Sequence, residues 1–298
     1  MIAYNHTIKF IPPLKNSQSL ANSPSKTITI KENNTMDFFT KPAYKMIFTS
    51  NQGRDLAVYS DRPFARTVVK QQWIFDIEGV MTFLWNSGEF TIDYLKSEDF
   101  TPELLKYWTL HILLPLFLSI EEHFYFLHAG AVEIDNAAVL FVAESFGGKS
   151  TMTDFFLNTK EHTMISDDKV AIFEEETSVL AVPSHPHHRP YRKREDLGLY
   201  VNNTSTEPKP ILAIYELNPV VADAPISITK AEGIEKFKIL RFSSEIRISF
   251  LKKTNFKALG SLAEKVPVYN ITVPWDIQRL EEVYTAIVKH SHTLKQPI

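Results

Sequence analysis

Residues 137–151 read AAVLFVAESFGGKST, an apolar run followed by a loop that ends in Gly-Gly-Lys-Ser-Thr. Apolar residues recur after the loop at Met152, Phe155 and Phe156, a spacing that a helix uses. A strand, a glycine-rich turn and a helix in this order form the setting of a phosphate-binding loop, because backbone N–H groups and the helix N-terminus then face an anion. The stretch therefore predicts a nucleotide-binding loop at the end of a strand.

The loop residues have separate expected tasks. Gly147 and Gly148 let the backbone approach the phosphates, and Lys149 reaches the terminal phosphates. The hydroxyl of Ser150 is an expected ligand of Mg²⁺. The expected nucleotide contacts are Ser145, Phe146, Gly147, Gly148, Lys149, Ser150 and Thr151.

A second candidate feature is the pair Asp167-Asp168, which lies between the apolar segments Met164-Ile165 and 170–173. One carboxylate at the end of a strand can hold Mg²⁺, and its neighbour can accept a proton from an attacking hydroxyl. A polar β-turn is the alternative interpretation of the same residues.

His128 is the third candidate, and it opens the apolar run before Asp135-Asn136. Asp-Asn between two apolar runs is a hairpin signal. A hairpin would bring His128 to the same edge of the sheet as the phosphate-binding loop. The alternative is a hydrogen-bonded histidine with a purely structural role.

The runs LHAGAVEID, VLFV, GGKST and ISDDKV, in this order, resemble the core of the HPr kinase/phosphorylase superfamily and its relatives over roughly residues 120–175. The resemblance implies an α/β fold shared with the nucleotide domain of phosphoenolpyruvate carboxykinase, with a P-loop and a mixed sheet. By the same resemblance, Lys149 and Ser150 bind phosphates and Mg²⁺. Asp167 corresponds to the general base, Asp168 to the metal-associated carboxylate, and His128 to the histidine beside the reacting phosphate.

The loop also departs from the usual pattern. Ala143 replaces the first glycine, so either the loop begins with less backbone strain than usual or the site has decayed. Glu144 and Phe146 replace small residues, and a carboxylate at Glu144 is unfavourable beside phosphates unless it faces Mg²⁺ or solvent. The chain lacks the longer downstream segment that engages HPr in HPr kinases, which argues against HPr itself as the substrate.

The segment from Val182 to Arg194 is basic and contains His185, His187 and His188. Zinc binding is a weak interpretation, because prolines interrupt the segment and neither a carboxylate nor a cysteine stands among the histidines. Anion recognition fits better, and Arg189 and Arg192, which flank Pro190-Tyr191, are expected to point inward and stabilise the transferred phosphoryl group. A solvated basic loop is the alternative.

Composition narrows the class of protein. The chain of 298 residues has a net charge of -3, so no global basic field favours a nucleic-acid partner. The absence of cysteine fits a reducing cytoplasm, and we expect a cytoplasmic protein without a signal peptide. The apolar segment 107–120 is shorter than the roughly 20 residues that span a bilayer, so it predicts a buried helix opened by Thr101-Pro102 and no membrane partner.

The expected organisation has two parts, with a boundary near residue 100. Residues 1–100 predict a β-rich region with a flexible arm near 13–35, an alternating stretch at 27–30 that reads as one strand, and further strands at 44–49, 56–59, 72–77, 80–85 and 90–94. Residues 101–298 predict the P-loop domain, with later strands at 211–217, at 241–250 with a helical interlude, and at 267–273, and a final helix at 276–290.

These features predict an enzyme that uses ATP or GTP with Mg²⁺ and transfers the γ-phosphoryl group to a hydroxyl. The acceptor is a serine on a small protein or peptide, or a small hydroxylated molecule, and a homo-oligomer is compatible with the sequence. The alternative is a nucleotide-binding regulatory or assembly protein of the same fold that has lost turnover. Carboxykinase chemistry is less favoured, because the chain shows no added His and Lys pattern for a decarboxylating metal site.

Overall fold

The computed structural model describes residues 1–14, 26–35, 44–49, 53–66, 68–122, 124–191, 193–246 and 248–294. The chain divides into two compact units. The first comprises Met1–His123, Lys193–Leu197 and Ile248–Leu251, and the second comprises Phe124–Arg192, Gly198–Arg247 and Lys252–Ile298. The helical segment after residue 100, which the sequence assigned to the second part, therefore lies in the first unit.

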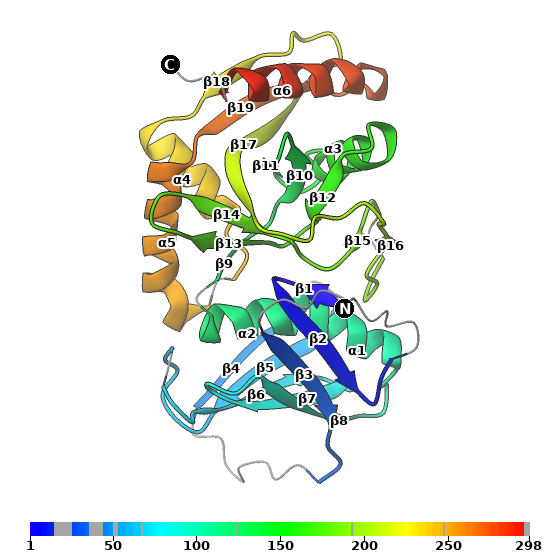
Figure 1. Cartoon of the computed structure of the whole chain (residues 1–298), viewed down its shortest axis with the longest axis vertical. Coiled ribbons are helices and arrows are strands. Elements are labelled where there is room, and N and C mark those ends of the chain that lie inside the picture. Colours follow the sequence, from blue (N-terminus) through cyan, green and yellow to red (C-terminus); the bar gives the residue numbers. More distant parts are fainter. Residues whose placement is uncertain are drawn as a thin grey trace. The chain divides into compact units, whose positions relative to one another are not determined.

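The described part of the first unit contains an eight-stranded sheet with the order β1-β2-β3-β8-β7-β6-β5-β4 (Figure 1). The strands expected between residues 44 and 94 are present within two residues of their expected bounds, and so is the strand at 27–30. The preceding strands β1 and β2 were not anticipated, and the part of the expected arm at 15–25 lies outside the described residues. The strands are β1 Ile2–Ala3, β2 His6–Ile11, β3 Thr27–Glu32, β4 Tyr44–Thr49, β5 Asp55–Ser60, β6 Gln72–Ile77, β7 Met81–Asn86 and β8 Thr91–Lys96.

A helical segment follows this sheet as α1 Pro102–Trp108, the π-helical turn η1 Thr109–Leu113 and α2 Leu114–Glu121. The Thr101 side chain caps it, accepting a hydrogen bond from Leu104 N at 3.1 Å, as expected. The π-helical turn ends two residues before Pro115, which lacks the N–H that a regular helix needs there. By length and composition the segment could cross a membrane, but 78% of its most apolar window is buried within the protein, as in the core helix of a soluble fold.

Two short segments from later in the sequence, Lys193–Leu197 and Ile248–Leu251, also belong to the first unit. Glu195 accepts hydrogen bonds from Arg54 Nε at 2.6 Å and from Trp108 Nε1 at 2.9 Å. Phe250, in the 3₁₀ turn η3 Ser249–Leu251, stacks on Phe64 and Trp73. These contacts explain why segments distant in sequence belong to this unit.

The second unit is built on a nine-stranded mixed sheet. Its main path is β12-β10-β11-β17-β14-β13-β9, and β19 pairs with β17 and β18. Strands β11, β17 and β19 run parallel, whereas the other pairings are antiparallel. The strands are β9 Tyr125–Leu127, β10 Gly130–Ile134, β11 Ala137–Val142, β12 Thr163–Ser166, β13 Val170–Glu174, β14 Val179–Val182, β17 Lys209–Val220, β18 Ile228–Lys230 and β19 Val268–Pro274, with a separate small pair of β15 His187–His188 and β16 Leu199–Tyr200.

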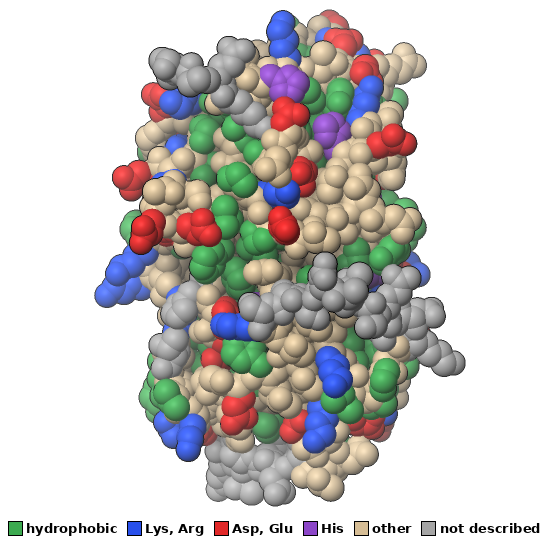
Figure 2. Space-filling view, in the orientation of Figure 1, with side chains coloured by type: hydrophobic (Ala, Val, Ile, Leu, Met, Phe, Trp, Pro, Cys, Tyr) green, Lys and Arg blue, Asp and Glu red, His purple; other side chains and the backbone are tan. Residues whose placement is uncertain are grey.

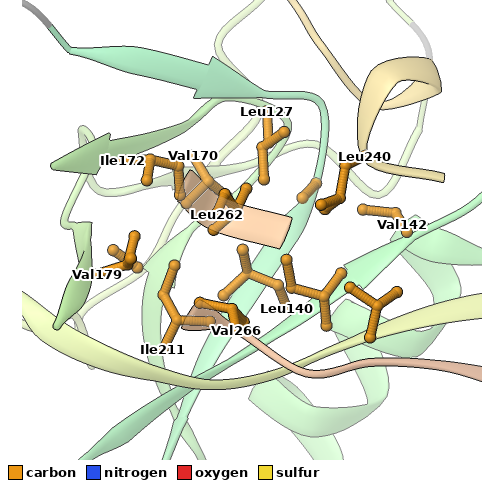
Figure 3. Close-up of a cluster of buried hydrophobic side chains, with 14 of the residues drawn as sticks. Leu127, Leu140, Val142, Val170, Ile172, Val179, Ile211, Leu240, Leu262 and Val266 are labelled. Carbon is orange, nitrogen blue, oxygen red and sulfur yellow. The ribbon is translucent and has the colours of Figure 1, made fainter. Parts of the chain in front are cut away.

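Helices cover both faces of this sheet. On one face, α4 Gly233–Phe242 and α5 Lys252–Lys265 contribute Leu240 and Leu262 to a buried cluster with Leu140 and other strand residues (Figure 3). On the other face lie α3 Lys149–Asp154 with the π-helical turn η2 Phe155–Thr159, and α6 Leu280–Leu294 after the 3₁₀ turn η4 Ile277–Arg279. The expected final helix is therefore present, and it packs on the sheet.

The predicted strand at 241–250 is wrong. Arg241 and Phe242 end helix α4, and Ser244 makes only an isolated bridge with Leu127. Polar and apolar residues alternate in this segment as they do in a strand, but its first two residues continue helix α4 and its last two belong to the 3₁₀ turn η3.

Charged side chains of both signs are interspersed on the face shown in Figure 2, among the residues that are described there. This distribution agrees with the small net charge of -3.

The fold places β10 in very close contact with α3, the helix that follows the glycine-rich loop after β11. A Cβ at Gly130 would lie 2.2 Å from Thr153 Oγ1, and this hydroxyl donates to Lys149 O at 3.0 Å. Gly130 therefore allows α3 to approach the sheet, and with it the first residue of α3, Lys149.

We expect Gly130→Ala to lower the free energy of unfolding by about 1–3 kcal/mol, because the added methyl group overpacks a buried contact. Adding Thr153→Ala should recover part of that loss, since it removes the clashing hydroxyl. Urea unfolding of the two single variants and the double variant measures this coupling. Gly260→Ala in α5, where an added Cβ meets open space, is the control and should not destabilise the protein. Additive effects of Gly130→Ala and Thr153→Ala would contradict the proposed contact.

Candidate functional site

The segment after β11 has the expected arrangement of strand, loop and helix. Strand β11 ends at Val142, and α3 begins at Lys149 with Gly148 as its N-cap. The loop's left-handed conformations occur at Phe146 (φ 67°) and Gly148 (φ 87°), so Ala143 occupies a position that does not require glycine. A Cβ at Gly147 would lie 2.9 Å from Ala143 Cβ, which shows how tightly the loop closes on itself.

Lys149 is buried, and its Nζ lies 3.6 Å from Asp168 Oδ1. The next residue, Ser150, is half-buried, and Thr151 is exposed. The first turn of a helix leaves its leading N–H groups without intrahelical partners, so residues 149–151 offer donors as well as side chains to an anion.

The carboxylate of Asp168 lies close to three other residues that were predicted for the site, Lys149, His128 and Arg189. It lies in the turn between β12 and β13 with a φ of 72°, and its Oδ1 is 3.1 Å from His128 Nδ1. Its Oδ2 is 3.7 Å from Arg189 Nη1. Lys149, His128, Asp168 and Arg189 therefore form one cluster beside the loop, whereas Arg192 lies outside the described residues.

His128 reaches this cluster because the expected apolar strand is interrupted. The chain leaves β9, which pairs with β13, and enters β10, which pairs with β11 and β12. His128 lies in the bend between them, and its backbone N–H donates a hydrogen bond to the backbone oxygen of Ser243 at 2.6 Å. The predicted hairpin is confirmed, with Asp135 and Asn136 both at positive φ in the turn between β10 and β11.

Asp167 faces the interior and is almost completely buried. Its Oδ2 accepts hydrogen bonds from His188 Nδ1 at 2.9 Å and from Arg189 N at 2.8 Å. Its Oδ1 is also buried and has no hydrogen-bond partner among the described residues. Burial acts to raise the pKa of Asp167, but the hydrogen bond from His188 and the charge of Lys149 outweigh it, so the pKa lies below its ordinary value.

His188 links Asp167 to helix α3. Its Nε2 lies 3.2 Å from Asp154 Oδ1, so the imidazole bridges two carboxylates. Burial acts to lower the pKa of His188, whereas the hydrogen bond to Asp167 and the charges of both carboxylates raise it above its ordinary value. The sequence marked His188 only as one of three neighbouring histidines.

The histidine-containing part of the basic segment, residues 185–188, is largely buried and is therefore not a solvated loop. His185, His187 and His188 are buried, and β15 pairs with β16. The proximity of His188 to Asp167 could not be read from the sequence, because 21 residues separate the two positions.

Glu245 is a further member of the site that sequence reasoning missed. It forms a close ion pair with Lys169 Nζ, and its Oε2 lies 3.7 Å from His128 Nδ1. The backbone N–H of Glu245 donates to Phe126 O at 3.0 Å, which holds the residue beside β9. Burial acts to raise the pKa of Glu245, but the charge of Lys169 lowers it below its ordinary value. Glu245 was missed because it lies 117 residues after His128, so no local spacing connects the two positions.

The carboxylate and hydroxyl groups of the site fit Mg²⁺ bound together with a nucleotide. Asp167 Oδ1 is a buried oxygen without a described partner, and Ser150 and Asp168 offer further hard oxygen donors. Among the described residues, no group of three or more His, Cys, Asp and Glu side chains is arranged to hold a metal by itself. An Mg²⁺ ion here would therefore depend on phosphate oxygens for several of its ligands.

A pocket of about 260 Å³ opens on the other side of the loop. Loop residues 144–147, residues 216–219 at the end of β17 and Trp275 line it. Glu144 is exposed and lines this pocket together with Glu216, so its carboxylate has a place away from the cluster around Lys149.

Comparisons with known proteins give a distant similarity in structure. No protein-family model matches the chain, and no curated protein matches it. Among solved structures, the HPr(Ser) kinase/phosphatase from Coxiella burnetii matches with a TM-score of 0.36 and 13% sequence identity. The match covers 57% of this chain and 99% of that one. A match at this level assigns neither an activity nor a substrate to this chain.

The pair of His188 and Asp167 predicts a pH-dependent stability. The raised pKa of His188 contributes stability that is present below its ordinary value of 6.5 and is lost as the pH rises through the higher folded-state pKa. The lowered pKa of Asp167 contributes stability that is present above 3.8 and is lost as the pH falls. His188→Asn keeps an N–H donor for Asp167 but removes the charge.

We expect His188→Asn to lower the free energy of unfolding by about 1–3 kcal/mol at pH 5.5 and by less at pH 9, because the contribution of the charge is lost as the pH rises through the raised pKa of His188. Chemical denaturation at both pH values measures the difference. His292→Asn is the control, because the ion pair of His292 with Asp135 is exposed and should contribute under about 1 kcal/mol. A loss of equal size at both pH values would contradict a charged His188.

Proposed function

We propose that the protein is a phosphotransferase that uses ATP or GTP with Mg²⁺ and transfers the γ-phosphoryl group to a hydroxyl acceptor. The observation that carries this proposal is the cluster at the phosphate-binding loop, in which Asp168 lies within 3.7 Å of Lys149, His128 and Arg189. Three cationic or protonatable groups around one carboxylate suit a reaction that moves a highly charged group to an oxygen nucleophile.

The loop and α3 would bind the nucleotide phosphates. Lys149 would exchange its contact with Asp168 for the terminal phosphates, and Arg189 would stabilise the charge that develops on the transferred group. Mg²⁺ would neutralise phosphate charge, held by Ser150 and by one carboxylate of the pair Asp167-Asp168.

The roles of the two aspartates follow from their surroundings. A general base must reach the acceptor hydroxyl, and the Asp167 side chain is 2% exposed whereas that of Asp168 is 23% exposed. Asp167 also has a lowered pKa, which weakens it as a base. We therefore assign the base to Asp168 and metal binding to Asp167, the reverse of the expectation from sequence.

In the proposed reaction, Asp168 accepts the proton of the acceptor hydroxyl while the acceptor oxygen forms a bond to the γ-phosphorus. The bond from this phosphorus to the bridging oxygen breaks, and the nucleoside diphosphate leaves. His128, in contact with both Asp168 and Glu245, would orient the carboxylate of Asp168. The acceptor is a hydroxyl-bearing protein, peptide or small molecule, and the protein would act in the cytoplasm.

The competing function is nucleotide binding without turnover. The sequence features that favoured it are compatible with an intact loop, because the backbone conformation of Ala143 does not require glycine and Glu144 lines the neighbouring pocket. Incubation with γ-labelled ATP or GTP, Mg²⁺ and a lysate of the source cell tests the two functions. A labelled acceptor that depends on Asp168 supports transfer, whereas nucleotide binding without any labelled product supports the competing function.

Lys149→Ala should abolish the stabilisation that Mg²⁺-nucleotide gives, because it removes the cation of the loop. A ligand at 100 times its Kd raises the free energy of unfolding by about 2.7 kcal/mol, which thermal unfolding detects. Lys252→Ala, at an exposed position of α5, is the matched control and should keep the full shift. A normal shift in Lys149→Ala would refute the phosphate-binding assignment.

The assignment of the two aspartates predicts distinct kinetic effects. Asp168→Asn should lower kcat by roughly 100-fold or more, with nucleotide affinity changed by a few-fold at most. Asp167→Asn should instead raise the Mg²⁺ concentration needed for nucleotide binding. Titrations of nucleotide and Mg²⁺ with single-turnover kinetics separate the effects, and the opposite pattern would return the base to Asp167.

A further inference from the structure

The pocket beside the loop lies at the edge of the sheet where three parallel strands end. Strands β11, β17 and β19 are parallel neighbours, so their carboxyl ends meet at one edge. The pocket is lined by the loop after β11, by the end of β17 and by Trp275, which directly follows β19. Ligands of open α/β sheets bind outside the carboxyl ends of parallel strands.

The loop separates this pocket from the proposed catalytic cluster. Strand β11 has β10 on one side, from which His128 and the Asp167-Asp168 turn are reached, and β17 on the other, where the pocket lies. A phosphate chain on the loop would therefore have its reacting end at the cluster and its other end at the pocket. The acceptor must approach the reacting end, which leaves the pocket to the nucleoside.

Trp275 has the properties of a stacking platform. It is 62% exposed, although its backbone is held by a hydrogen bond from its N–H to Val220 O at 2.9 Å. A Cβ on Gly148 would lie 4.0 Å from Trp275 Cζ3, so the indole ring lies beside the loop itself. An exposed and anchored tryptophan next to a phosphate-binding loop can stack on a planar base.

The polar lining of the pocket favours hydrogen-bond donors. Glu144 and Glu216 both contribute to it. Burial, and then repulsion from Glu235 and Glu144, raise the pKa of Glu216, although a hydrogen bond with Asn218 acts in the opposite direction. A ligand that donates N–H groups would relieve this repulsion, and an ionised carboxylate can only accept.

We propose that this pocket binds the base of the nucleotide, stacked on Trp275, and that Glu216 selects guanine over adenine. Guanine carries N–H donors at two adjacent ring positions, which one carboxylate can accept together, whereas adenine presents an acceptor beside its amino group. At about 260 Å³ the pocket lies near the lower limit of ligand sites, so it suits a base rather than a whole nucleotide. The inference rests on the proposed function, because the phosphates must occupy the loop.

The test compares GTP, ATP, xanthosine triphosphate and inorganic tripolyphosphate, each with Mg²⁺, on the full chain. Trp275 is itself the probe, because the other three tryptophans, Trp73, Trp85 and Trp108, are buried. GTP should quench the fluorescence of Trp275 and protect it from acrylamide, whereas tripolyphosphate should bind without either effect. The wild-type protein should bind GTP at least tenfold more tightly than ATP.

Three variants assign the preference to the pocket. Trp275→Ala should weaken GTP binding by roughly 5- to 100-fold, as measured by calorimetry, and leave tripolyphosphate binding unchanged. Glu216→Gln should weaken GTP binding by at least tenfold and strengthen the binding of xanthosine triphosphate, whose ring presents a carbonyl where guanine has its amino group. Ile277→Ala, at an exposed neighbouring position, is the control and should change neither.

The outcomes separate this inference from the proposed function. If tripolyphosphate binds in a manner that requires Lys149, but GTP and ATP bind equally well and the Trp275 and Glu216 variants change nothing, the base pocket is refuted and the proposed function stands. If neither tripolyphosphate nor any nucleotide binds through Lys149, the proposed function fails and the inference fails with it.

Discussion

The burial of the Asp167 carboxylate is the constraint on which the site depends. A charge in the protein interior is stable only if it is paired and hydrogen-bonded, and His188 together with the N–H of Arg189 meets this need. Because His188 also contacts Asp154 of α3, one imidazole connects the segment after β14 with the turn after β12 and with the helix after the glycine-rich loop. Arg189 is placed by the same hydrogen bonds, since its own backbone N–H contacts the buried carboxylate. The buried ion pair therefore positions a cation that the proposed reaction uses.

A second constraint is the passage of the chain from β9 to β10, because these two short strands pair with different neighbours. The bend between them places His128 at the cluster around Asp168, where a continuous strand would have placed it in a ladder. Glu245 reaches the same place from a distant segment, through backbone pairing with β9. The ion pair of Glu245 with the buried Lys169 then keeps the carboxylate next to His128. Basic side chains thus lie next to both carboxylates, Asp168 and Glu245, which allows these groups to lie close together without strong repulsion.

The mixed sheet gives the loop between β11 and α3 two different sides. Toward β10 and β12 lie the charged groups that suit chemistry on a phosphoryl group. Toward β17 and β19 lies a pocket with an exposed tryptophan and two carboxylates, which suits recognition of a planar ligand. Strand order alone produces this division, because β11 is flanked by antiparallel β10 and by parallel β17. Glu144 would be unfavourable beside bound phosphates, but it lines the pocket on the side of β17.

Local patterns in the sequence were sufficient for the elements that carry local signals. The strand, loop and helix at 137–159, the Asp135-Asn136 hairpin, the cap at Thr101 and the strands of residues 44–96 depend on near neighbours in the chain, and the structure contains all of them. The sequence also identified Lys149, His128, Asp168 and Arg189 as candidates. Only the tertiary structure decided that His188 pairs with Asp167, that Glu245 joins the site from a helix end, and that Trp275 lies against the loop. These contacts join segments that are 21 to more than 100 residues apart, and no periodicity or local spacing encodes them. They arise because the sheet brings the ends of distant strands together. A buried charge such as that of Asp167 must be paired and hydrogen-bonded, and only the folded chain places its partner nearby.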